Sequence, residues 1–340
     1  MKPWCLAVAG ACASIAASLI GCSAGMAQAT GTGAAGKPIR LLIPSGPGGG
    51  YDAYGRIVAR HIGSHLSGNP VVTAEGMPGG GGIAEANYLA KVAPKDGTVI
   101  GILQNNMPLK PILDPRQIKY SLQDFGWLGS VTPVTNIGLV KPGAPVRVAS
   151  DLLSHELIVG GSGGSTTYVP EMLNRLMHTK FKVVKGYKGS DEVMLAIERG
   201  EVEGIVGIAY DSISQSAEAA AVNGKLLFQM GLRRDPMLAD VPLIQELAPP
   251  AARAVLECVF AAFQIGRIFA APAGVPAARL EELRKAFADT MADPAFRQDA
   301  ERLHLGVNSQ RAEAIDAIIR SVAQQPATVL GPAREALAAE

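Results

Sequence analysis

The sequence predicts an α/β protein made of two lobes, with two crossings of the chain between them. Short apolar segments alternate with segments of helical periodicity, a pattern typical of sheets covered by helices. Three of the apolar segments run into glycine-rich turns that open a helix, at residues 45–50, 76–82 and 160–165. With 340 residues, the chain is long enough for two lobes and a sizeable core.

Elements in the first part of the chain follow each other as strand, turn and helix. We predict strands at 39–43, 71–75 and 98–103 and helices near 51–66 and 82–92. In the first helix Val58, Ile62 and Leu66 recur at helical spacing, and Asp96-Gly97 forms the turn before the third strand. Such short alternating units imply a mainly parallel sheet with helices on both faces.

The second lobe lies between the two crossings. A proline-rich irregular stretch leads to the first crossing, a strand-like segment at 137–140 followed by Lys-Pro-Gly-Ala-Pro. Beyond it we predict strands at 157–160, 181–185, 204–208 and 225–231 and helices at 165–178 and 190–199. The return crossing is at 269–276, and helices near 276–292, 294–303 and 310–323 close the chain. We therefore divide the chain into a signal peptide at 1–29, a flexible linker at 30–37, a first lobe of 38–137 plus 264–340, and a second lobe of 138–263.

The three glycine-rich turns predict an anion site. Each leaves backbone N–H groups at the positive end of a helix dipole, and glycine lets a ligand approach the backbone closely. In an α/β lobe such turns lie at the carboxyl ends of the strands, where ligands bind in open sheets. One turn of this kind would indicate only a tight connection, but three favour a site that gathers a small anion from several sides.

The charge balance argues against a nucleic-acid partner. Lys and Arg number 31 against 30 Asp and Glu, so the net charge is +1, and 5% of the residues are aromatic. Proteins that bind nucleic acids usually carry a basic excess or aromatic stacking platforms. We therefore expect a small-molecule ligand and no nucleic acid.

The first residues form an export signal. Lys2 precedes an apolar stretch at 5–20 that is too short for a transmembrane span. Two processing sites compete: an A-x-A site at 27–29, which releases a chain starting at Thr30, and a lipobox-like segment at 19–22, which would leave a lipid on Cys22. We favour the A-x-A site. Cys258 is the one cysteine beyond this leader, so we expect no internal disulfide and a buried apolar role for Cys258.

Nucleotide and metal sites are matched only weakly. The segment 79–84 fits a loose dinucleotide fingerprint, but the next strand ends in Gln-Asn-Asn rather than in the acidic residue that binds a ribose. His61 and His65 have the spacing of two metal ligands on a helix, but no glutamate follows His61 and no third ligand is evident. We therefore expect no cofactor and no metal.

An α/β hydrolase is the competing hypothesis. Residues 160–164 match G-x-S-x-G between a strand and a helix, which would make Ser162 a nucleophile. Asp240 and His304 follow Ser162 in the order that this class of enzyme requires. A run with four glycines matches the motif easily, so we rank the hydrolase below a binding protein and predict that the chain is not an enzyme.

Six further motifs occur in a fixed order over about 38–325. They are PxxPGGxxD at 44–52 with Arg56 one turn on, PGGGGI at 78–83, PKDGT at 94–98, GYKG at 186–189, a segment from Arg233 to the DVP at 240–242, and APxGVP at 271–276. Together they resemble the substrate-binding proteins of tripartite tricarboxylate transporters, the Bug/TctC family. One departure is Tyr51, which stands where that family commonly has Thr or Ser; it would narrow the pocket or stack on an aromatic acid.

This resemblance implies a two-lobed periplasmic binding protein, type II-like and of the Venus-flytrap kind. Such a protein closes on a small mono-, di- or tricarboxylate and delivers it to inner-membrane permease subunits, or in some members to a sensor kinase. A periplasmic monomer is the expectation. If Cys22 is lipidated, the same binding site would belong to a ligand-sensing lipoprotein.

The resemblance also implies where the ligand is held. Backbone amides of the first two turns would bind one carboxylate, and the third turn would meet the ligand as the cleft closes. Ser165, Thr166 and Thr167 would donate further hydrogen bonds, and Lys188 is the candidate cation. The full set of implied ligand contacts is Ser45, Gly46, Pro47, Gly48, Gly49, Tyr51, Asp52, Gly79, Gly80, Gly81, Gln104, Gly163, Ser165, Thr166, Thr167, Tyr187, Lys188, Gly189, Tyr210 and Asp211.

Overall fold

A computed structural model of the chain describes residues 36–213 and 221–338. The expected signal peptide, Cys22 and all but the last two residues of the linker at 30–37 lie outside the described residues. Among the helices that are described, none combines the length and the apolar composition that a membrane span requires.

The first lobe is the part built on a six-stranded sheet with the order β11-β4-β10-β3-β1-β2. Its strands are β1 (Ile39–Ile43), β2 (Val72–Gly76), β3 (Val99–Leu103), β4 (Phe125–Ser130), β10 (Ile268–Pro272) and β11 (Gln310–Arg311). β1 pairs in parallel with β2 and β3, whereas β10 runs antiparallel to β3 and β4. All residues of β3, β4 and β10 are buried, which is expected for strands covered on both faces.

The second lobe is built on a five-stranded sheet with the order β7-β6-β8-β5-β9. Its strands are β5 (Asn136–Val140), β6 (Leu157–Gly161), β7 (Phe181–Lys185), β8 (Gly204–Ala209) and β9 (Lys225–Met230). β6 pairs in parallel with β7 and β8, and β5 runs antiparallel to β8 and β9.

Both sheets are therefore mixed, and the expectation of a mainly parallel sheet is wrong. β10 and β5 run antiparallel to both of their neighbours, and β11, at the edge of the first sheet, runs antiparallel to β4. β5 and β10 are the strands that the chain enters on passing from one lobe to the other. The neighbouring strands end at the cleft, while a crossing strand begins there, so it must run against them. The sequence prediction also missed β4, which lies in the stretch taken as irregular.

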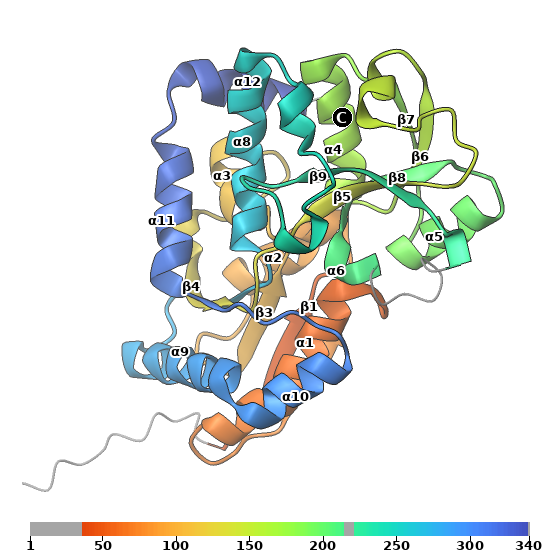
Figure 1. Cartoon of the computed structure of the whole chain (residues 1–340). Helices are drawn as coiled ribbons and strands as arrows, with labels where there is room; N and C mark the ends of the chain where they lie inside the picture. The colour runs from red at the N-terminus through yellow and green to blue at the C-terminus, as the bar shows by residue number, and fades with distance from the viewer. Residues whose placement is uncertain (1–35, 214–220, 339–340) are drawn as a thin grey trace, which may run out of the picture. The chain divides into compact units, whose positions relative to one another are not determined.

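Helices cover both sheets (Figure 1). They are α1 (Gly49–Ile62), α2 (Ile83–Lys91), α3 (Lys110–Leu113), α4 (Ser165–Met177), α5 (Ser190–Glu198), α6 (Tyr210–Ile213), α8 (Pro250–Ile265), α9 (Ala277–Ala292), α10 (Pro294–Arg302), α11 (Ala312–Ala323) and α12 (Ala327–Ala338). α1 packs on β1 and β2 and against α9 and α10, while α4 packs on β7 and β8. α8, which the sequence prediction also missed, packs against α11 and α12, and α12 packs in turn against α3 and α4. The last helix therefore touches elements of both lobes.

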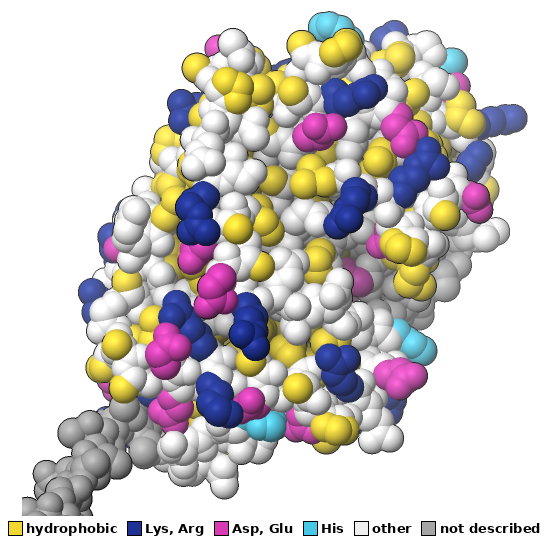
Figure 2. Space-filling model, turned by 60° about the vertical axis from the view of Figure 1, so that its left-hand side comes forward, with side chains coloured by type: hydrophobic (Ala, Val, Ile, Leu, Met, Phe, Trp, Pro, Cys, Tyr) yellow, Lys and Arg dark blue, Asp and Glu magenta, His cyan; other side chains and the backbone are white. Residues whose placement is uncertain are grey.

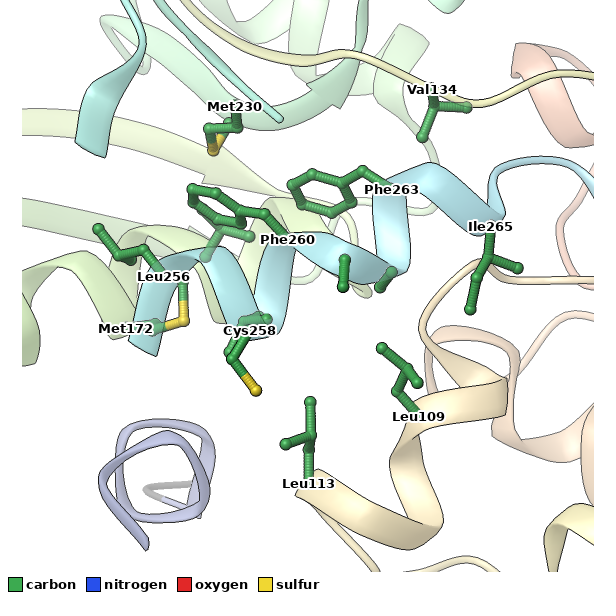
Figure 3. Close-up of a cluster of buried hydrophobic side chains, with 14 of the residues drawn as sticks. Leu109, Leu113, Val134, Met172, Met230, Leu256, Cys258, Phe260, Phe263 and Ile265 are labelled. Carbon is green, nitrogen blue, oxygen red and sulfur yellow. The ribbon is translucent and has the colours of Figure 1, made fainter. Parts of the chain in front are cut away.

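Two minor sequence features have plain structural roles. His61 on α1 lies 2.9 Å from the carboxylate of Asp299, and His65, in the turn just after α1, lies 3.1 Å from that of Asp293. The two histidines therefore link the end of α1 and the turn after it to the segment around α10. Within the described chain, no group of three or more His, Cys, Asp or Glu side chains could hold a metal ion. Cys258 is buried on α8 among apolar side chains, as expected, and burial raises the pKa of its thiol (Figure 3).

The surface charge matches the balanced composition. On the face seen in Figure 2, basic and acidic side chains lie interspersed rather than gathered by sign. A surface of this kind favours no strongly charged macromolecular partner on that face.

Candidate functional site

A cavity of about 1030 Å³ lies at the carboxyl ends of β1, β2, β3, β6, β7 and β8, where the three glycine-rich turns come together. The N-termini of α1, α4 and α5 contribute to its wall, so helix dipoles and backbone N–H groups are gathered around it. The predicted contacts that line the cavity are Ser45, Gly46, Pro47, Gly48, Gly49, Tyr51, Gly79, Gly80, Gly81, Gln104, Gly163, Ser165, Thr166, Thr167, Tyr187, Lys188 and Gly189.

Three predicted contacts, Asp52, Tyr210 and Asp211, lie outside the cavity wall. The carboxylate of Asp52 accepts a hydrogen bond from the backbone N–H of Gly48 at 3.2 Å and pairs with Arg56 at 2.8 Å. Asp52 therefore stabilises the first glycine turn from outside the cavity wall. Asp211 also lies outside the cavity wall, and its contact with the wall is the ion pair with Arg267 described below.

The turns meet across the cleft at close range. A Cβ added to Gly81, in the second turn, would lie 2.9 Å from the backbone nitrogen of Gly164 in the third. A Cβ on Gly48 would lie 2.6 Å from a carboxylate oxygen of Asp191 at the start of α5. At Gly81 glycine is thus required because the backbones of the two lobes approach each other closely, whereas at Gly48 the close neighbour is a side chain.

The third turn is held by its own threonines. The hydroxyl of Thr166 accepts from the Ser162 N–H at 3.0 Å and donates to the Gly163 carbonyl at 2.8 Å. The hydroxyl of Thr167 accepts from the Gly163 N–H at 3.1 Å. These bonds use the Thr166 hydroxyl inside the turn, whereas the sequence argument gave it the role of a ligand donor.

Replacing Thr166 by valine is expected to lower the free energy of unfolding by about 1–3 kcal/mol, because buried groups of the turn lose their partner. Denaturant unfolding measures this loss. Thr166→Ser is the matched control and should retain most of the stability. A loss in Thr166→Ser as large as that in Thr166→Val would show that the hydroxyl contributes no more to the turn than the methyl group does.

The geometry at Ser162 is not that of a nucleophile elbow with its base. The Ser162 hydroxyl lies 3.2 Å from that of Thr166. In the described part of the chain, no histidine lines the cavity. The nucleophile–base hydrogen bond on which the hydrolase hypothesis depends is therefore not formed.

Arg267 is a wall residue that the sequence argument missed. It lines the cavity although it is only 1% exposed. Its Nη2 donates to Asp211 at 2.7 Å and to the hydroxyl of Ser212 at 3.2 Å. The guanidinium lies 4.4 Å from the centre of the Tyr51 ring and 5.2 Å from that of Tyr54, which is cation–π distance. One face of the Tyr51 ring is thus covered by the guanidinium.

The guanidinium stays charged despite its burial. Burial alone would lower the pKa of Arg267, but the Asp211 carboxylate and the two tyrosine rings raise it above its ordinary value. Because Arg267 precedes β10 in the first lobe and Asp211 follows β8 in the second, this ion pair joins the lobes beside the cavity.

The part of the wall near Arg267 lies where the two crossings between the lobes meet. The backbone N–H of Arg267 donates to the Thr132 carbonyl at 2.9 Å, and its carbonyl accepts from the Val131 N–H at 3.0 Å, so the two crossings are bonded to each other. Arg267 Nε, Asn136 Nδ2 and the Tyr168 hydroxyl have no hydrogen-bond partner among the described residues. A buried donor without a hydrogen-bond partner costs about 1–3 kcal/mol of stability. This cost favours a ligand or water oxygen as an acceptor at this part of the wall.

Residues 55–327 match the family described as the tripartite tricarboxylate transporter family receptor. The chain belongs to this family. Among its relatives, the receptor is 26% identical over 325 residues to a Cupriavidus necator protein described as the UPF0065 protein in the gbd 5' region, with 90% of each chain covered. It is 23% identical over 270 residues to a Bordetella pertussis UPF0065 protein, covering 76% of this chain and 78% of the relative.

Solved structures share the fold of this receptor. A Rhodopseudomonas palustris protein solved with adipate superposes with a TM-score of 0.68 at 20% identity, covering 87% of this chain and 97% of the other. MatC from Rhodopseudomonas palustris, solved with bound malate, superposes with a TM-score of 0.66 at 19% identity, covering 88% and 99%. These likenesses establish the two-lobed α/β fold of solute-binding proteins.

Proposed function

We propose that this receptor captures a carboxylate in the cavity between its lobes. The observation that carries the proposal is the meeting of three glycine-rich turns, from both lobes, around one cavity beside a buried arginine. Backbone N–H groups and helix N-termini stabilise an anion there without requiring one basic side chain for each negative charge of the ligand. Relatives in fold solved with adipate and malate are consistent with this chemistry.

The two lobes give the ligand contacts on both sides of the cleft. Ligand binding to both lobes at once favours the arrangement in which the turns touch, since only that arrangement makes both sets of contacts. We place the ligand's carboxylate against the first two turns, with the third turn completing the site. No catalytic role is proposed for Ser162.

Gly81→Ala is expected to weaken carboxylate binding by about tenfold or more, because the new Cβ would press on the Gly164 backbone 2.9 Å away and hold the lobes apart. The measurement is a thermal-shift screen with acetate, succinate, adipate, citrate and benzoate, followed by calorimetry on those that stabilise the wild type. Sodium chloride at equal ionic strength controls for salt.

Gly143→Ala is the matched control for this test. Gly143 has a φ of 81°, against 61° for Gly81, but a Cβ there meets nothing within 4 Å. It therefore carries the same backbone strain without the contact across the cleft. Failure of every carboxylate to shift the wild-type melting temperature would overturn the proposed function, and equal binding by the two variants would overturn the assignment of the site.

We further propose that the receptor is exported to the periplasm as a monomer and hands its ligand to inner-membrane permease subunits. Family membership supports this destination. The mass of the mature protein tests its processing, because cleavage before Thr30 and lipidation of Cys22 give different N-termini.

A further inference from the structure

The cavity extends beyond the glycine turns into an apolar arm between the two lobes. The arm is defined by wall residues from α2, the short helical turn Met107–Leu109, α3, α8 and α12, namely Ile83, Leu109, Leu113, Val259, Ala262 and Leu337. Figure 3 shows Leu109, just before α3, and Leu113 of α3 pointing toward α8. Both α3 and α8 pack against α12, which closes this side of the arm.

The size of the cavity exceeds what a small acid needs. Its volume of about 1030 Å³ is at the upper end of the range, about 300–1,000 Å³, that holds drug-sized ligands. A dicarboxylate of four to six carbons bound at the glycine turns would leave most of this space unfilled. Protein interiors are close-packed and carry few voids, so an apolar space beside an anion site is best explained by the body of the ligand.

The outer rim of the arm carries two cations that share one carboxylate. The carboxylate of Asp114 pairs there with Lys110 at 2.6 Å and with Arg116 at 2.7 Å. These bonds lower the pKa of Asp114 despite its partial burial, so the aspartate is ionised and balances one of the two positive charges. Arg116 also donates to the backbone carbonyls of Leu337 and Ala338 at the end of α12. The arm is therefore lined by apolar side chains and ends at a rim where both cations contact the same carboxylate.

We propose that the apolar arm holds the hydrophobic body of the ligand, so that this receptor takes carboxylic acids with a large apolar group. This inference rests on the proposed function, which supplies the site for the carboxylate. Burial of the apolar group would supply most of the affinity, at roughly 25 cal/mol for each Å² removed from water. It would give binding a negative heat-capacity change.

The experiment compares carboxylic acids whose bodies differ in size, by calorimetry at several temperatures. Acetate, succinate and adipate have small bodies, while decanoate and 2-naphthoate have large apolar ones. We expect the better of the two large acids to bind at least tenfold more tightly than any small one, with a negative heat-capacity change. Decanoate and 2-naphthoate also distinguish a chain from a ring.

Two variants test the location. Ala262→Leu fills the arm from α8 and should weaken the large acid tenfold or more while leaving the small acids unchanged. Ala261→Leu is its matched control, since Ala261 neighbours it on α8 but does not line the cavity. Leu337→Trp fills the arm from the half-buried end of α12, where the fold is less sensitive to a larger side chain, and should act like Ala262→Leu.

Each outcome decides the matter. Small acids binding as tightly as large ones would overturn the inference while leaving the proposed function intact. So would preferential binding of large acids that neither Ala262→Leu nor Leu337→Trp weakens. Absence of binding by every acid would overturn the proposed function and this inference with it.

Discussion

Replacing Gly266 by alanine is expected to lower the free energy of unfolding by roughly 2–5 kcal/mol, from strained backbone and a steric clash together. Gly266 ends α8 with a φ of 65° and a ψ of −130°, a conformation that residues with a Cβ rarely adopt. A Cβ there would lie 1.9 Å from the Thr132 carbonyl oxygen and 2.6 Å from Cα of Pro133. Both are backbone atoms and cannot turn away as a side chain can.

The clash falls where the two crossings meet. Relief requires the segment at 131–133 to separate from the segment at 266–267, and that would stretch the hydrogen bond from the Arg267 N–H to the Thr132 carbonyl. The lobes are joined through these segments, so a shift here also changes how the cavity walls are placed. We therefore expect Gly266→Ala to weaken ligand binding in whatever fraction stays folded.

Chemical denaturation of Gly266→Ala beside wild type measures the first effect. Gly143→Ala again serves as the control, because its φ is 81° and its Cβ would meet nothing within 4 Å. The control should lose only the cost of a positive φ, of order 1 kcal/mol. If the two variants lost the same amount, the close approach of the crossings would not be a source of stability.

Local sequence patterns predicted the turns well because their causes are local. Strand β1, the glycine turn after it and the start of α1 follow from hydrophobic spacing and from glycine itself. The same holds for the third turn, between β6 and α4. The direction of β5 and β10 could not be predicted in this way, since it depends on which lobe the chain comes from.

The place of Arg267 in the cavity wall is a feature that local sequence patterns did not predict. Arg267 is the single charged residue in the apolar run at 258–275, and that isolation is the signal that could have marked it. A lone buried charge needs a partner, and here the partner is Asp211, 56 positions away in the chain. Asp211 was selected as a ligand contact, whereas the structure places it behind the wall as the counter-ion of the residue that lines it.

Glu85, in the core of the first lobe, is a second residue whose surroundings local sequence patterns did not predict. A glutamate in the first turn of a helix is normally a solvated group that favours the helix dipole. In α2, however, Glu85 is fully buried over β3, where a Cβ on Gly101 would lie 2.4 Å from its Oε1. Neither carboxyl oxygen finds a hydrogen-bond partner within the described chain. Burial therefore raises the pKa of Glu85 well above its ordinary value of 4.5.

Because the Glu85 carboxyl is buried, we expect a stability difference between wild type and Glu85→Gln that grows with pH. Above pH 4.5 the unfolded chain releases the Glu85 proton while the folded protein keeps it, so the folded state binds more protons. The free energy of unfolding then falls by up to about 1.4 kcal/mol for each pH unit until the folded pKa is reached. Glu85→Gln does not titrate, and we expect it to gain on wild type by this slope as pH rises from 5 to 8.

Denaturant unfolding of both proteins at matched pH values isolates Glu85, because every other titrating group is common to the two. The orphaned amide of Glu85→Gln costs the same at each pH and cannot produce a slope. Glu85→Met removes the polar group altogether, and we expect it to be more stable than wild type at pH 7 because burying an unpartnered polar group is costly. A difference between wild type and Glu85→Gln that stayed constant from pH 5 to 8 would mean that the folded protein ionises Glu85 as readily as the unfolded chain does.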